Sequence, residues 1–294
     1  MDAFNSLLLH NIQINGFDFH PKCEKLQLTN VYFTDDLFLI SGATVRSFKV
    51  IHKTLDEFGN MFGLNPNLDK SVCFFAGTSD RNMDKLSSIL NISIGALPVR
   101  YLGVPLTTWQ LRASDCRRLI DNIKNKIDQW KHRHVSYAGR VTLINCLVWY
   151  HELLGSMSIS AQCLFLPIEV CNEIEKHVRA FLWSGSNLNK YKSKVAWAQV
   201  GKRKKEGGLE IKRLHEWNQA CMCFHIWNLC SMKETLWVQW INTYRLNGCS
   251  FWSLSGKSTD RWVWRKLIRL KDFIRQHITI KIGTGENCNF LFDN

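Results

Sequence analysis

The chain has 294 residues, of which 46% are hydrophobic and 21% charged, a balance typical of a folded globular protein rather than a disordered one. Its 38 basic and 25 acidic residues give a formal net charge of +13, which favours a polyanionic partner such as nucleic acid. The 11 cysteines are scattered, which argues against a disulfide framework and favours a reducing compartment, the nucleus or the cytoplasm.

Residues 1–17 predict a helix, and residues 31–40 (VYFTDDLFLI) predict a β-hairpin. Apolar, β-branched and aromatic residues run up to Asp35 and Asp36 and then resume. Ionised carboxylates avoid so apolar a run unless a turn exposes them or a cation partners them, so we expect both at the hairpin tip. Adjacent carboxylates on a rigid turn are suitable ligands for Mg²⁺, although an ordinary Asp-Asp surface turn is the alternative.

Residues 45–63 predict the clearest helix, because apolar residues recur at three- and four-residue steps and Gly63 follows as a stop. The apolar stripe consists of Val45, Phe48, Ile51, Leu55, Phe58 and Phe62. We expect the hairpin to pack against this helix through Phe48, Ile51 and Phe58. A strand over 72–75 follows, with Lys70 at its entrance, and residues 100–106 (RYLGVPL) predict a second short hairpin.

Residues 112–134 predict a second amphipathic helix, and a third helix begins at Tyr137. The buried stripe of the second helix consists of Cys116, Leu119, Ile120, Ile123, Ile127 and Trp130. Its other side carries charges of both signs. Such a face is either simply solvated or contacts a nucleic-acid backbone, which positions a duplex without reading its sequence.

Residues 176–205 carry nine basic and no acidic residues. These are Lys176, Arg179, Lys190, Lys192, Lys194, Lys202, Arg203, Lys204 and Lys205. Because Trp183 and Trp197 lie within the stretch, it suits phosphate contacts combined with base stacking. Residues 202–205 equally suit a nuclear-localisation-like patch or a plain exposed loop. Nine of the chain's 12 Trp lie beyond residue 180. Five of them predict a packed helical C-terminal layer, namely Trp237, Trp240, Trp252, Trp262 and Trp264.

Several short motifs surround these elements in a fixed order. They are HPKC at 20–23, GLNPN at 63–67, LPVRYLGVPL at 97–106, SYAGR at 136–140, FLWSG at 181–185 and EGGL at 206–209. In this order and spacing the chain closely resembles the reverse transcriptase of plant LINE-type (non-LTR) retrotransposons. The resemblance runs from about residue 19 onward and covers only the later part of that enzyme.

The resemblance implies an α+β fold in three parts. Residues 1–77 would be a partial polymerase palm with the Asp-Asp hairpin, residues 78–180 a palm-end hairpin with thumb-like helices, and residues 181–294 a basic, Trp-rich helical extension ending before a zinc-binding segment. It also implies an RNA-directed DNA polymerase, a nucleotidyltransferase that uses Mg²⁺ on Asp35 and Asp36, with RNA and DNA as partners. We expect no zinc and no membrane association. The implied nucleotide or primer contacts are Phe33, Thr34, Lys70, Tyr101 and Gly103.

The first catalytic Asp of the family lies upstream of the region that the chain resembles. Only Asp2, Asp18 and Glu24 precede the hairpin here, none on a plausible strand, so we expect the third metal ligand to be missing. We therefore expect a truncated polymerase that is inactive alone, and leave open whether another chain supplies the missing half. The alternatives are a non-catalytic nucleic-acid-binding remnant and a non-functional pseudogene product.

The motifs depart from the family pattern at three positions. Thr34 stands where the family usually has Ala before the Asp pair. In the motif around EGGL, Arg203 replaces a Pro and Glu210 replaces a Gly. Such drift is what a decaying element copy would show.

Overall fold

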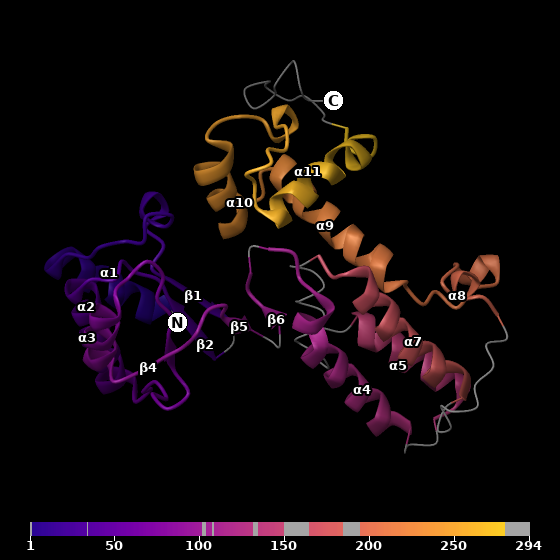
Figure 1. Cartoon of the computed structure of the whole chain (residues 1–294), viewed down its shortest axis with the longest axis horizontal. Helices are drawn as coiled ribbons and strands as arrows, with labels where there is room; N and C mark the ends of the chain where they lie inside the picture. Colours follow the sequence, from indigo (N-terminus) through magenta and orange to yellow (C-terminus); the bar gives the residue numbers. More distant parts are fainter. Residues whose placement is uncertain are drawn as a thin grey trace. The chain divides into compact units, whose positions relative to one another are not determined.

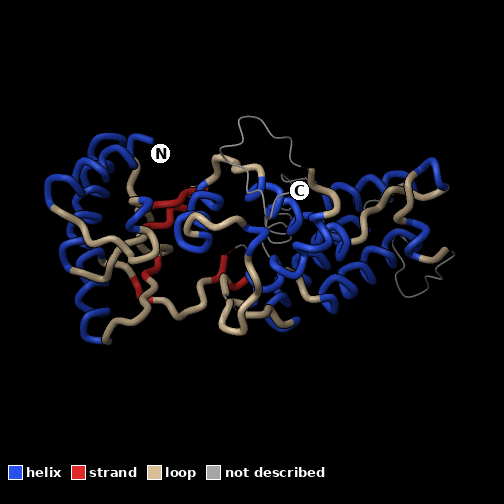
Figure 2. Tube along the Cα trace, turned by 90° about the horizontal axis from the view of Figure 1, so that it is seen from above, coloured by secondary structure: helices blue, strands red, loops and turns tan. Residues whose placement is uncertain are grey.

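The computed structural model describes residues 2–33, 35–101, 104–107, 109–131, 135–149, 165–184 and 195–279. The described residues are mainly helical, with a few short strands (Figure 2). The chain forms two compact units. The N-terminal unit comprises Met1–Val99 together with Gln239–Gly248, and the C-terminal unit comprises Arg100–Val238 together with Cys249–Asn294.

The N-terminal unit contains three helices and two small sheets (Figure 1). The helices are α1 (Asp2–Asn15), α2 (Val45–Phe62) and α3 (Asp80–Leu90), with a 3-10 turn, η1 (Glu24–Leu26). Strands β1 (Asn30–Phe33) and β2 (Asp36–Leu39) pair antiparallel, and β3 (Val72–Cys73) pairs parallel with β4 (Ser93–Ile94). The first pair is the hairpin that the sequence predicts over residues 31–40.

Helix α2 is the helix predicted over residues 45–63. It begins after Thr44, whose hydroxyl accepts a hydrogen bond from the Ser47 backbone N–H at 3.3 Å and so satisfies one of the unpaired donors of the first turn. It ends at Gly63, which adopts a left-handed conformation with φ of 69° that glycine reaches without steric cost. Both boundaries therefore follow from local chemistry.

The core of the N-terminal unit forms around α2. Phe48 and Ile51 are buried with Leu86 and Leu90 of α3, and Leu39 of the hairpin packs against the same cluster. The expected packing of the hairpin on α2 is therefore present through Phe48 and Ile51.

The other side of α2 faces α1 and the hairpin. There Phe4 and Leu8 of α1 are buried with Val50, and Phe58 packs against them. The prediction that Phe62 faces the core is wrong. Phe62 is 51% exposed, and its neighbour Met61 is also exposed, because the last turn of α2 runs past the core.

Buried polar groups tie α1 to α2. Asn11 is 2% exposed, and its amide donates to the Thr54 hydroxyl at 3.2 Å and to the Glu57 carboxylate at 2.6 Å. The Thr54 hydroxyl in turn donates to the Val50 carbonyl at 2.8 Å. A buried amide without such partners would carry a desolvation penalty of about 1–3 kcal/mol, so this arrangement fixes how the two helices face each other.

A distant segment completes the N-terminal unit. It consists of the end of α10 (Leu236–Ile241) and a π-helical turn, η5 (Asn242–Leu246). The Trp240 indole N–H donates to the Lys22 carbonyl at 2.8 Å, and the Lys25 backbone N–H donates to the Tyr244 hydroxyl at 2.8 Å. The residues of the HPKC motif are thus held by a segment more than 200 positions later in the chain.

The C-terminal unit is a helical assembly. It contains β5 (Arg100–Tyr101) paired with β6 (Val104–Pro105), η2 (Ala113–Cys116), α4 (Arg117–Lys131), α5 (Tyr137–Trp149), α7 (Ile168–Ser184), α8 (Trp197–Val200), η4 (Lys204–Glu206), α9 (Leu214–Cys230), η6 (Phe251–Ser253) and α11 (Trp262–Arg275). Helix α7 packs against α4, α5 and α9 (Figure 1). All six residues of the stripe predicted over 112–134 are buried, Cys116 in η2 and the other five along α4, which confirms that prediction.

The predicted domain limits fall at other points of the chain than the limits of the two units. Residue 77 precedes α3, which belongs with α2 in one core, and residue 180 lies inside the continuous helix α7. The unit limit between residues 99 and 100 lies just before β5.

The core of the C-terminal unit predicts a large effect for Ile123→Ala. Ile123 on α4 is 1% exposed, so removing three carbons should lower the free energy of unfolding by about 2–5 kcal/mol. Ile168→Ala on α7 is the matched control, because Ile168 is 47% exposed and should change stability little. Urea unfolding followed by circular dichroism measures both, and equal losses in the two variants would contradict this packing.

Candidate nucleic-acid interface

The Asp pair lies at the tip of the first hairpin. Phe33 is paired with Asp36, so Asp35 lies in the turn and Asp36 begins β2, and both residues are exposed. Their carboxylates supply the hard oxygen ligands that Mg²⁺ prefers. Among the described residues, however, no group of three or more His, Cys, Asp and Glu side chains lies close enough together to hold a metal ion. The hairpin therefore fits a magnesium site only in part, with two of its carboxylates.

The other predicted nucleotide and primer contacts are distributed over both units. Phe33 and Lys70 belong to the N-terminal unit and Tyr101, in β5, to the C-terminal unit. Lys70 is exposed and lies in a turn, where its backbone N–H donates to the Asn67 side chain at 3.2 Å. Several predicted site residues lie outside the described residues, namely Thr34, Gly103, Lys190, Lys192 and Lys194. The region predicted to approach a zinc-binding segment, beyond residue 280, lies outside them as well.

The four basic residues at 202–205 lie together on one exposed loop, which we call the 202–205 loop. Backbone hydrogen bonds close it at its base. The Leu209 N–H donates to the Val200 carbonyl at 2.9 Å, and the Glu210 N–H donates to the Lys202 carbonyl at 3.0 Å. The loop is therefore anchored on both sides, and its cationic side chains are directed to solvent.

The EGGL motif explains how the loop turns. Gly207 has a φ of 79°, which favours glycine, and Gly208 lies so close to the opposite strand of the loop that an added Cβ would be 2.0 Å from the Lys202 carbonyl oxygen. Glu210, at the position where the sequence departs from the motif that it resembles, has a φ of 55°. A non-glycine residue in this region is strained by about 1–2 kcal/mol, so this departure has a physical cost.

The stacking role expected for Trp197 is wrong, and Trp183 is partly buried. Trp197 is 9% exposed and packs in the core, with the Arg179 guanidinium 5.2 Å from its ring centroid. Trp183 packs against the same core and lies 5.9 Å from the Tyr137 ring. Both indoles are in the sequence beside basic residues, but the helices turn them inward, where aromatic burial is worth more than exposure.

The SYAGR and FLWSG motifs meet in the structure. The Arg140 guanidinium donates to the Phe181 carbonyl at 3.3 Å, at the end of α7 where helix carbonyls have no partner within the helix. The same guanidinium lies 5.6 Å from the Tyr137 ring, and the Ser136 hydroxyl accepts from the Gly139 N–H at 3.2 Å. These two motifs therefore have a structural role. The sequence shows the residues but not this pairing.

The charged face between α4 and α7 is largely neutralised. Lys124 donates to the Glu173 carboxylate at 3.0 Å, and this hydrogen bond lowers the pKa of Glu173 below its usual range. Burial, together with the nearby Lys124, lowers the pKa of His177 below its usual value. This face is thus a weaker candidate for binding phosphates than the 202–205 loop.

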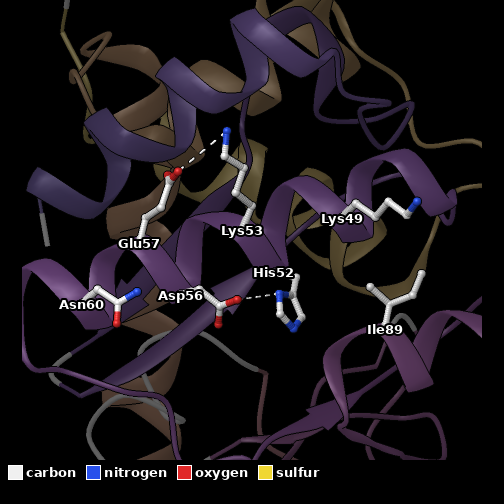
Figure 3. A pocket seen from close by; sticks show the side chains of 7 residues that line it. All are labelled: Lys49, His52, Lys53, Asp56, Glu57, Asn60 and Ile89. Atoms are coloured by element: carbon white, nitrogen blue, oxygen red, sulfur yellow. Dashed lines mark ion pairs between the residues drawn. The ribbon is translucent and has the colours of Figure 1, made fainter.

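An open pocket of about 400 Å³ lies on α2 beside Ile89 of α3 (Figure 3). Its charges compensate one another along the helix. His52 is 2.8 Å from Asp56, and Lys53 is 3.7 Å from Glu57. Exposed pairs of this kind are worth up to about 1 kcal/mol. Lys49, which also lines the pocket, makes no ion pair with a described carboxylate, so one positive charge remains there.

No protein-family model matches the chain. The chain is similar to two proteins of Arabidopsis thaliana. It is 26% identical over 195 residues to "Putative ribonuclease H protein At1g65750", covering 65% of the chain and 30% of that protein. It is 23% identical over 132 residues to "Uncharacterized mitochondrial protein AtMg00310", covering 45% of the chain and 86% of that protein. The chain thus spans under a third of the first relative's length.

The described helices include none that combines the length and the apolar character needed to cross a membrane. Among the site residues predicted from the sequence, the exposed Asp pair of the hairpin and the exposed cations of the 202–205 loop favour a ligand.

The geometry of the 202–205 loop predicts that Gly208→Ala disrupts this loop. A Cβ at this position would overlap the Lys202 backbone, so the loop must open, and we expect a loss of about 1–3 kcal/mol in the free energy of unfolding. Gly256→Ala is the control, since its Cβ would meet only Ile268 at an ordinary 3.7 Å. Thermal unfolding measures the difference, and a Gly208→Ala variant as stable as the control would refute the close approach.

Proposed function

We propose that the chain is part of a retroelement reverse transcriptase, and that its own contribution is to bind nucleic acid through the 202–205 loop. The serial order of the motifs supports a LINE-type origin. A relative named for ribonuclease H fits the same origin, because copying RNA into DNA leaves an RNA–DNA hybrid, which is the substrate of a ribonuclease H. In this proposal RNA and DNA are the partners, and Asp35 and Asp36 are two of the carboxylates of a polymerase site.

The observation that carries the binding proposal is the presentation of four adjacent cations on an anchored loop. Lys202, Arg203, Lys204 and Lys205 are all exposed, and none of them makes an ion pair with a carboxylate of the described residues. A duplex carries condensed counterions along its phosphates, and unpaired protein cations release those counterions when they contact the phosphates. A loop whose base is fixed loses little conformational entropy when it binds.

The first experiment replaces Lys202, Arg203, Lys204 and Lys205 by Ala and measures affinity for a fluorescein-labelled 30-base-pair duplex over a salt series. Phosphate binding predicts weaker affinity and a slope of log affinity against log salt that is flatter by up to about 0.9 per lost contact. Sequence changes in the duplex should have little effect, because backbone contacts carry no sequence information.

The matched control removes four exposed cations elsewhere, Lys49, Arg81, Lys85 and Lys233. It lowers the net charge by the same amount and should flatten the slope much less. If both variants behave alike, the effect is one of overall charge, and if the loop variant keeps the parent slope, the loop is an idle surface or a transport signal.

The second experiment concerns catalysis. We expect the purified chain to show no detectable extension of a primed RNA template with Mg²⁺ or Mn²⁺. Nucleotidyl transfer uses two metal ions to stabilise the attacking and leaving oxygens, and this needs a further carboxylate besides Asp35 and Asp36. Among the described residues none is grouped with them. Without that ligand the stabilisation of the transition state is lost, together with the positioning of template and nucleotide.

The decisive control is Asp35→Asn. Template-dependent extension by the parent chain that disappears in this variant would overturn the expectation, and would mean that a third carboxylate reaches the hairpin after all. Extension that persists in Asp35→Asn would instead point to a contaminating polymerase.

A further inference from the structure

Helix α11 divides its residues sharply between two faces. One face carries the buried apolar residues Trp264, Leu267, Ile268 and Ile274. The opposite face carries Arg265, Lys266 and Arg269, with Arg261 at the start of the helix. At about 100° per residue these four cations occupy roughly 140° of the circumference, and we call them the α11 cationic face. This face has a signal in the sequence, because its basic residues recur at steps of three and four residues within a Trp-rich stretch.

The remaining cations of α11 have a different role. Lys271 donates to the Trp252 and Leu254 carbonyls at 3.1 and 2.7 Å, so it satisfies the backbone of the η6 turn. The Arg275 guanidinium lies 5.8 Å from the Trp252 ring. Both residues lie on the buried side of the helix, where their stems pack and their charged ends reach polar partners. They are therefore structural, which separates them from the α11 cationic face.

The α11 cationic face has few neutralising groups. Arg261 and Arg269 are exposed, whereas Arg265 and Lys266 are partly buried, and the Lys266 ammonium lies 5.6 Å from the Trp262 ring centroid. None of the four cations forms an ion pair with a described carboxylate. Asp272 is the acidic residue on this side of the helix. Over residues 249–279 there are seven basic and two acidic residues, and residues 176–205 have nine basic and none acidic. These two stretches together carry a net charge of +14, one more than the +13 of the whole chain, so the rest of the chain is close to neutral.

The chemistry of this face selects among polyanions. A membrane surface would need the apolar side of α11 to enter the lipid, but that side is buried in the protein's own core. Three of the four cations are Arg, whose planar fork binds phosphate through two parallel hydrogen bonds. Arg261 and Arg269 are eight residues apart, about 12 Å along the axis, over which one strand of a duplex presents three or four phosphates.

We infer that the α11 cationic face is a second contact for the nucleic-acid backbone, separate in sequence from the 202–205 loop. The inference rests on the proposed function, because it takes the same class of ligand. Phe273, which is 52% exposed on the same side of the helix, adds an apolar surface at the end of this row. Such a contact holds a duplex without reading its bases.

The test replaces Arg261, Lys266 and Arg269 by Gln in the full chain and uses the same 30-base-pair duplex and salt series. Each lost contact should flatten the slope of log affinity against log salt by up to about 0.9. If parent and variant bind equally at 1 M salt, the variant should therefore bind up to about eightfold more weakly than the parent at 0.1 M salt for each lost contact. The matched control replaces Lys49, Arg81 and Lys85 by Gln, three exposed cations of the N-terminal unit. The control should keep the parent slope.

Two further variants keep the result interpretable. Lys271→Gln removes a cation of the same helix that contacts backbone carbonyls, so it should lower the melting temperature and leave the slope unchanged. Arg269→Gln alone changes one exposed side chain and should flatten the slope by up to about 0.9 with an unchanged melting temperature. If the triple variant has a lower melting temperature than the parent, the single variant Arg269→Gln is used in its place to test the contact.

The outcomes separate the two proposals. If the parent chain does not bind the duplex, the proposed function fails and this inference fails with it. If the parent binds and the 202–205 variant flattens the slope, but the α11 variants match their control, the proposed function stands and the α11 contact is refuted. A face that serves an acidic protein partner would give this second result.

Discussion

A buried carboxylate on α7 sets the arrangement of the C-terminal unit. Glu175 is 8% exposed and accepts a hydrogen bond from the Leu214 N–H at 2.7 Å, so it caps the first turn of α9. In return, the Asn218 side chain of α9 accepts from the Leu166 N–H just before α7 at 3.1 Å. An unpaired group at either place would be costly, so α7 and α9 have one relative position. Helix α11 packs on α9 and depends on the same arrangement.

Some cations of this chain stabilise the fold and others are exposed to solvent, and the net charge does not distinguish these two groups. Some cations have partners inside the fold. Arg140 binds a carbonyl at the end of α7, Arg179 lies over the Trp197 ring, and Lys271 binds a carbonyl of the turn around η6. Others are exposed in rows or loops and lack carboxylate partners among the described residues. Only the second kind contributes counterion release to binding a polyanion. A basic composition therefore indicates a partner only after the structural cations have been set aside.

The local elements were predictable from the sequence, because their causes are local. Period and capping define α2, and the apolar run around Asp35 and Asp36 defines the hairpin. The sequence did not show that Trp197 is buried, because a Trp beside basic residues has the same local sequence whether its side chain faces the core or the solvent. It also did not show the pairing of Arg140 with Phe181, which joins residues 41 positions apart. For the Asp pair, the sequence predicts the hairpin, whereas the metal chemistry depends on a carboxylate from elsewhere.

The return of residues 239–248 to the N-terminal unit affects how the chain can fold during synthesis. Trp240 and Tyr244 provide partners for the backbone around Lys22 and Lys25, yet about 140 residues are synthesised between residue 99 and this segment. At about 5–20 residues per second, the ribosome needs roughly 7–30 s for that stretch. Throughout that interval the N-terminal unit lacks part of its own structure, while most of the other unit emerges. The nascent chain thus passes through a long period in which its first 99 residues lack part of their structure and are accessible to chaperones.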